Sequence, residues 1–158
     1  MKFETDLIHF GYMNKNNRIY SMNSYDWSDV IQRSQNGTLL GELNHPDNFD
    51  ITVKRISHII RDIEVYQDGV YGEVEILKTD KGIELQTLID SGIKMVFRPR
   101  SAGKVDSNGN VTIEKLYTFD AIPASEDAFF NRNLFRLKKL EKIMKIIDDK
   151  RRNSEDSL

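Results

Sequence analysis

One stretch of this chain restricts its fold more than any other: a turn signal followed by alternating apolar and acidic residues. Asp68-Gly69 is a dipeptide typical of a tight β-hairpin turn. The eight residues after it, 70–77, read VYGEVEIL. Because successive side chains of a strand point to opposite faces, this pattern predicts a strand with one buried and one exposed face. A half-exposed strand entered through a hairpin indicates an antiparallel sheet.

Four other segments carry the apolar and aromatic residues expected of further strands: 3–13, 51–65, 93–102 and 111–122. The segment 51–65 is long enough for two strands, and its inward-facing candidates are Val53, Ile56, Ile59 and Ile63. Turn residues at 79–82 and 106–110 separate the later segments. Two short helices are also predicted, from Ser24 to Gln35 with Ser24 as N-cap, and from about Ile83 to Ser91 with Gly92 as its stop.

The C-terminal part is of a different kind. Between Phe129 and Lys150, apolar residues recur at helical spacing, at Leu134, Leu137, Leu140, Ile143, Met144 and Ile147. Basic residues lie between them, a pattern typical of a solvated helix face. We expect the apolar side of this helix to pack on the β domain or to pair with another copy, and residues 151–158 to be frayed. The predicted organisation is a domain over 1–128 and a helical extension with a polar tail over 129–158.

Composition excludes several kinds of chemistry. The chain has 158 residues, no cysteine and a formal net charge of −2. Disulfides, thiolate catalysis and thiolate metal sites are therefore excluded, and nucleic-acid binding is disfavoured. The acidic, polar N-terminus is unlike a secretory signal, and no apolar run is long enough to span a membrane, so we expect a cytosolic protein. His9, His45 and His58 lack close metal-ligand spacing, and there is no nucleotide-binding fingerprint, so no metal or cofactor is expected.

The segment GELNHP (41–46) is the strongest candidate for chemistry. It places His45 between a side-chain amide and a proline, which biases the backbone at His45 away from helix. A histidine can act as general acid or base near neutral pH, because its unperturbed pKa is about 6.5. A structural turn histidine is the alternative. Ser101 and Asp120 are the other candidate pieces of a serine hydrolase site, although composition alone does not assemble them.

Six segments occur in the order and with the spacing of one family: NKNNRIY (14–20), GELNHP (41–46), IIRD (59–62), VYG (70–72), DSG (90–92) and FDAI (119–122). The chain resembles the prohead core (capsid maturation) serine proteases of tailed bacteriophages, whose fold is related to herpesvirus assemblin. The resemblance implies an α+β fold, a mainly antiparallel β-barrel flanked by helices, with a C-terminal helix. It implies that His45 is the general base and that Asp120 orients it. The implied partners are phage scaffold or core proteins and the major capsid protein, inside the assembling prohead in the host cytoplasm.

The chain departs from the family at the nucleophile. Where the family reads Gly-Val-Ser-Ser-Arg-Gly-x-Gly, residues 96–103 read VFRPRSAG, so Arg98 and Pro99 stand at the two serine positions. Arginine is no nucleophile, and proline removes a backbone donor. Ser101 is the nearest serine, but its odd offset on a strand directs it to the other face unless a bulge or turn intervenes. Ser91, Ser107 and Ser125 are the other serines nearby.

Two functions follow from these residues. The first is a prohead endopeptidase that uses His45, Ser101 and Asp120; the second is a pseudo-protease, an inactive protein of the same fold that serves as a structural or scaffold-binding component of the head. A serine hydroxyl within about 3 Å of the His45 ring would favour the enzyme. Asp120 and Ser101 have structural alternatives, and His58 is either a strand residue or a further catalytic member. Arg98 and Arg100 either line a groove for an acidic partner or are solvated.

Overall fold

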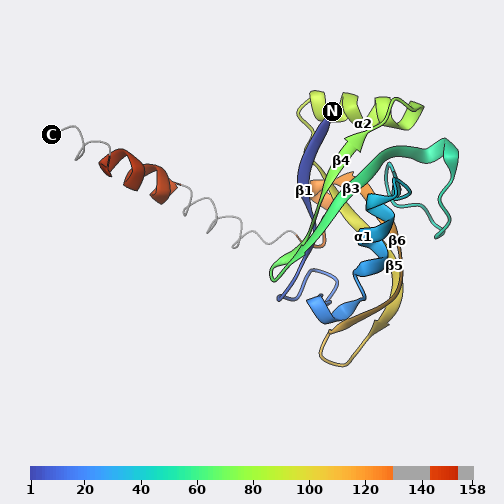
Figure 1. The fold of residues 1–158 in the computed structure, drawn as a ribbon, viewed down its shortest axis with the longest axis horizontal. Coiled ribbons are helices and arrows are strands. Elements are labelled where there is room, and N and C mark those ends of the chain that lie inside the picture. The colour runs from blue at the N-terminus through green and yellow to red at the C-terminus, as the bar shows by residue number, and fades with distance from the viewer. Residues whose placement is uncertain (130–142, 153–158) are drawn as a thin grey trace.

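The computed structural model describes residues 1–129 and 143–152. Within 1–129 the chain forms two antiparallel sheets and two α-helices (Figure 1). The larger sheet has the order β1-β4-β3-β2, with bounds Lys2–His9, Gly69–Ile76, Ile56–Tyr66 and Leu40–Glu42. The smaller sheet pairs β5 (Met95–Val105) with β6 (Val111–Pro123). The helices are α1 (Ser28–Gln35) and α2 (Asp80–Asp90), and single 3-10 turns occur at Met22–Ser24, Val53–Arg55 and Ala124–Glu126.

The predicted hairpin is present. Strands β3 and β4 meet at Asp68-Gly69, with Tyr66 paired to Gly69. Along β4 the buried and half-buried residues alternate from Val70 to Ile76, as the sequence pattern requires. The two sheets pack against each other through aromatic rings, because Phe97 of β5 contacts Phe3 of β1 and His58 of β3. The α+β class and the antiparallel pairing are therefore confirmed.

The expected closed barrel is not present, because the two sheets do not join into one in the described part of the chain. On one side, β2 is three residues long and is followed by a single bridge from Leu43 to Ala121 of β6. A left-handed Asn44 (φ 70°) and Pro46 end β2 there. On the other side, the Arg98 side chain of β5 donates to the Asp6 carbonyl of β1 at 2.9 Å. A closed barrel would require backbone hydrogen bonds between β1 and β5. At Asp6 the carbonyl instead accepts from the Arg98 side chain.

The helices differ from their predicted bounds for local reasons. Helix α1 begins at Ser28, and Ser24 instead closes the preceding 3-10 turn, where its hydroxyl accepts from the Ser21 amide. Helix α2 begins earlier than expected, because the Thr79 hydroxyl caps it by accepting from the Gly82 amide at 3.0 Å. The predicted stop is present at Gly92, which has a φ of +85°. In Figure 1, α2 lies across one end of the larger sheet, near the start of β1.

The segment 51–65 forms one long strand and not two. Strand β3 starts at Ile56, whereas Val53 lies in a 3-10 turn with 82% of its surface exposed. The prediction of Val53 as an inward residue is therefore wrong. The reason is a polar contact that holds the preceding residues in a loop: the Thr52 amide donates to the buried Glu42 carboxylate at 2.9 Å.

Residues 143–152 are helical and exposed throughout. Ile143, Met144 and Ile147 are 44%, 63% and 56% exposed, so the described structure does not show them packed on the β domain; pairing with another copy, the other expectation, stays a prediction. The predicted positions Leu134, Leu137 and Leu140 lie outside the described residues, as does the tail from 153 to 158. Residues 151 and 152 continue the helix. Among the described residues, no helix is both long and apolar enough to cross a membrane.

Candidate functional site

The site is built around one contact between residues 75 positions apart. The His45 Nδ1 atom lies 2.8 Å from Oδ2 of Asp120, which is fully buried in β6. Burial by itself raises the pKa of Asp120, but the hydrogen bonds from Arg100 and His45 outweigh it and hold that pKa below its ordinary value. The carboxylate is therefore ionised at neutral pH and can only accept. Nδ1 of His45 must then carry the proton, which leaves Nε2 as the basic nitrogen of the neutral ring.

The loop that carries His45 is positioned by its own backbone. Asn44 adopts a left-handed conformation (φ 70°), which is rare outside glycine but tolerated by asparagine. In this conformation its amide donates to the Ala121 carbonyl at 2.7 Å, one residue after Asp120 on β6. The side chain of His45 is 41% exposed, so the ring reaches solvent on one side and Asp120 on the other.

Arg100 holds the carboxylate from the opposite side. Its Nε and Nη2 atoms donate to the two oxygens of Asp120 at 2.8 and 2.6 Å, and Nη2 also donates to Glu42 at 2.8 Å. Its Nη1 atom donates to the carbonyls of Phe49 and Asp50, both at 3.2 Å. Asp120 and Glu42 are both fully buried. Arg100 is thus neither solvated nor part of an open groove: it is a buried, bidentate partner that fixes the orientation of Asp120.

Arg98, which the sequence resemblance aligned with the nucleophile of the prohead proteases, is also buried. Its guanidinium donates to both oxygens of Asp127 at 2.7 and 2.8 Å, and to the Asp6 carboxylate at 3.0 Å. Burial lowers the pKa of Arg98, but these carboxylates outweigh it and raise that pKa above its usual value. The side chain is therefore a permanent cation with its donors occupied. Neither of the two sequence expectations for Arg98, a groove lining or a solvated residue, describes it.

Ser101 does not join His45. A bulge does occur beside it, since Arg100 pairs with Thr118 and Ser101 with Leu116, but the extra residue is on β6. Strand β5 therefore keeps its alternation, which directs Ser101 to the face opposite Arg100. There it borders a separate hollow of about 280 Å³ with Phe49 and Lys104 among its lining. In the described part of the chain, no serine hydroxyl is hydrogen-bonded to the His45 ring.

His58 has a structural environment. Its Nε2 atom donates to the Phe119 carbonyl at 2.8 Å, so Nδ1 of the neutral ring accepts from the Ser57 hydroxyl at 2.7 Å. Complete burial lowers the pKa of His58 to about 4. Both ring nitrogens are occupied by these partners. The contacts of His58 therefore do not support the hypothesis that it is a further catalytic residue.

Sequence reasoning missed three carboxylates of this region: Glu42, Asp6 and Asp127. The one available signal was the pair Arg98 and Arg100 inside a strand otherwise suited to burial, because buried arginines require anionic partners. That signal does not say which carboxylates they are. Among the described residues, no group of three or more His, Asp or Glu side chains could hold a metal ion.

The fold and the site define a class: an α+β protein with two packed antiparallel sheets, which carries a histidine paired to a buried aspartate. The structure resembles that of the bacteriophage T4 capsid assembly protease, gp21, with a TM-score of 0.63 and 22% sequence identity. The match covers 78% of this chain and 82% of the phage protein. The chain matches no protein-family model and no curated protein sequence. The shared fold is that of a phage prohead protease; the expected relation to herpesvirus assemblin stays a prediction.

Proposed function

We propose that this chain is a pseudo-protease of bacteriophage head assembly, which uses a protease fold to bind other head proteins. The observation that carries the proposal is the burial and ion pairing of Arg98, the residue that the sequence resemblance aligns with the prohead proteases' nucleophilic serine. The fold shared with the T4 capsid assembly protease supports the setting in the phage head. Scaffold or core proteins and the major capsid protein are the proposed partners, within the assembling prohead in the host cytoplasm.

An active endopeptidase is the second candidate, and the His45–Asp120 contact favours it. In that mechanism Nε2 of His45 removes the proton of a serine hydroxyl as it attacks the peptide carbonyl. Asp120 stabilises the imidazolium that forms, and the proton then passes to the leaving amine. Ser101 is the default nucleophile, and it would have to reach the face of β5 that carries Arg100. The orienting role of Asp120 and the base role of His45 belong to this candidate.

The two candidates are separated by co-expression with the phage's own scaffold and major capsid proteins, read by intact mass and by co-purification. The forms compared are wild type, His45→Ala, Ser101→Ala and, as a matched control, Ser107→Ala in the exposed turn after β5. We expect the wild type to bind its partners without cutting them. Cleavage lost in both His45→Ala and Ser101→Ala, but retained in Ser107→Ala, would overturn this expectation and identify the nucleophile.

A further variant examines the nucleophile position directly. Arg98→Ser places the family's serine directly across from Asp120 in the β5–β6 pairing, and its folding is checked by circular dichroism. Cleavage that appears in this variant and disappears again on adding His45→Ala would show that the wild type is inactive because it lacks a nucleophile.

We also propose that the C-terminal helix pairs with a second copy of the chain. Four exposed apolar residues support this: Ile143, Met144, Ile146 and Ile147. Such a run on a solvated helix favours association, because pairing removes apolar surface from water. Analytical ultracentrifugation of Ile147→Glu should show a smaller species than wild type, whereas an unchanged mass would exclude this helix as the contact.

A further inference from the structure

A compact clamp holds residues 127–129, the last described residues before the C-terminal segment. The Phe129 ring is buried; it stacks on His9 with centroids 5.5 Å apart and has the Arg98 guanidinium over its face. The Lys15 amide donates to the Ala128 carbonyl at 2.9 Å. Arg98 binds Asp127. The residue that replaces the family's nucleophile thus helps to anchor the end of the described body.

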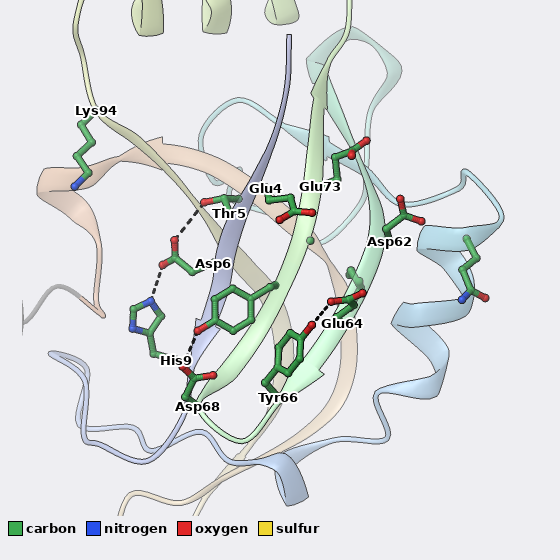
Figure 2. A pocket seen from close by; sticks show the side chains of 14 residues that line it. Glu4, Thr5, Asp6, His9, Asp62, Glu64, Tyr66, Asp68, Glu73 and Lys94 are labelled. Atoms are coloured by element: carbon green, nitrogen blue, oxygen red, sulfur yellow. Dashed lines mark hydrogen bonds and ion pairs between the residues drawn. The ribbon is translucent and has the colours of Figure 1, made fainter. Parts of the chain in front are cut away.

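A chain of three hydrogen bonds runs from β1 to this clamp. The Asp6 carboxylate lies 2.6 Å from Nε2 of His9. Figure 2 draws this contact as a dashed line. Nδ1 of His9 lies 3.0 Å from the Tyr12 hydroxyl. That hydroxyl donates to the Phe129 carbonyl at 2.8 Å. The three contacts share two ring nitrogens and one hydroxyl proton.

Counting protons shows that one state of His9 satisfies all three bonds. The hydrogen bond from His9 and the charge of Arg98 lower the pKa of Asp6 despite its burial, so this carboxylate only accepts and Nε2 is the donor. Burial raises the pKa of Tyr12, which therefore keeps its single proton. When the His9 ring is protonated, Nδ1 donates to Tyr12, and Tyr12 donates to Phe129. When the ring is neutral, Nδ1 needs the Tyr12 proton, which Phe129 also needs.

The charged groups around the ring come from several elements. Asp6 lies on the same strand, Arg98 on β5 and Asp127 after β6, while Asp68 and Lys94 line the same hollow as His9. Arg98, the buried cation on the Phe129 ring, is paired with both Asp6 and Asp127.

We propose that the Asp6–His9–Tyr12 chain is a proton-controlled clamp, which holds residues 127–129 more firmly when His9 is protonated. When the His9 ring loses its second proton, the clamp loses one hydrogen bond. Residues 127–129 are then held less firmly against β1 and the segment around Tyr12. This inference is independent of the proposed pseudo-protease role, since it concerns a different histidine and a structural readout.

Amide hydrogen exchange of the full chain, followed by NMR at pH 5.5 and 7.5 and corrected for intrinsic rates, tests the clamp. The reporter is the Lys15 amide, which is bonded to Ala128; the reference is the Ile93 amide, bonded to Leu88 at the far end of α2. We expect Lys15 protection to fall about two- to tenfold at the higher pH, the effect of one neutral hydrogen bond, with Ile93 unchanged.

Two variants connect this change to its cause. In Tyr12→Phe the hydroxyl is missing, so Lys15 protection should be low at both pH values; in His9→Gln the ring no longer titrates, so protection should not depend on pH. Wild-type protection that is independent of pH, or a pH dependence that persists in Tyr12→Phe, would overturn the proposal.

Ring-nitrogen NMR of the wild type gives a second measurement that needs no variant. The neutral His9 ring should carry its proton on Nε2, and a proton on Nδ1 would contradict the clamp.

Discussion

Gly41, the first residue of the GELNHP segment, is required by packing. A Cβ atom at this position would lie 2.1 Å from Nε2 of His58 and 2.4 Å from the Phe119 carbonyl oxygen. These are the two atoms of a buried hydrogen bond, so the backbone of β2 passes directly over it. The glycine therefore permits β2 to approach β3 and β6 closely enough to deliver His45 to Asp120.

Gly41→Ala should destabilise the protein by about 3 to 5 kcal/mol, because overpacking adds to the loss of a buried hydrogen bond. Urea denaturation measures the change. Gly92→Ala is the matched control: its φ is +85° and nothing lies within 4 Å of the added Cβ, so only the left-handed backbone is strained, at about 1 kcal/mol. Equal costs for the two variants would show that the contact with His58 is unimportant.

His58 makes stability depend on pH. Its pKa is lowered by burial to about 4 in the folded protein, against about 6.5 in an unfolded chain. The unfolded state therefore binds more protons between these values, and stability is complete above pH 6.5 and falls as pH drops toward 4. From pH 7 to pH 5 the expected loss is about 2 kcal/mol.

The measurement is the free energy of unfolding at several pH values, in wild type and in His58→Gln, which cannot titrate. The difference between the two slopes isolates the contribution of His58 from that of the other histidines. A His58→Gln slope equal to that of wild type would contradict the burial argument.

At the scale of elements, helix α2 depends on one cap. The Thr79 hydroxyl accepts from the Gly82 amide and donates to the Ile56 carbonyl of β3, so it both starts the helix and ties it to the sheet. The first turn is packed tightly, since a Cβ at Gly82 would lie 1.7 Å from the Leu77 carbonyl oxygen. This close approach fixes where α2 can sit at the end of the larger sheet.

Thr79→Ala should cost about 1 to 2 kcal/mol, because a helix amide and a strand carbonyl each lose a partner. Thr79→Ser keeps the hydroxyl and should retain most of the stability. Thermal and urea unfolding of the three forms provide the comparison. If serine were as destabilising as alanine, the methyl group and not the hydroxyl would be the important part of the side chain.

At the scale of the molecule, Arg100 is the joint between the two sheets. It starts from β5, binds Asp120 of β6 within the smaller sheet, and binds Glu42 of β2 in the larger one. Its contacts with the carbonyls of Phe49 and Asp50 add the loop that follows His45. Among the described residues, the bridge that pairs the backbones of the two sheets is Leu43–Ala121, and the Arg100 side chain adds further contacts between them.

Arg100→Met should destabilise the protein by about 3 to 5 kcal/mol, because two buried carboxylates lose their cation. Adding Glu42→Gln should recover part of this loss, since one of the two unpaired charges is then removed. Urea denaturation of the single and double variants forms a double-mutant cycle. Strictly additive costs would mean that Arg100 and Glu42 do not interact in solution.

The sequence alone determined those features whose physics is local. Asp68-Gly69 specifies a hairpin, alternation specifies the buried face of β4, and Gly92 ends α2, because turn chemistry and side-chain period act over a few residues. The segment around His45 was recognisable for the same reason, since asparagine and proline restrict its backbone directly.

Only the tertiary structure decided which groups meet. Asp120 faces His45 because of strand register, and Arg98 and Arg100 are buried because carboxylates from distant elements surround them. Exposure was equally non-local: Val53 and Ile147 are apolar yet exposed, as nothing in the described structure packs over them. A residue's own pattern shows what it can bury, but burial requires a second surface, which the arrangement of the whole chain supplies.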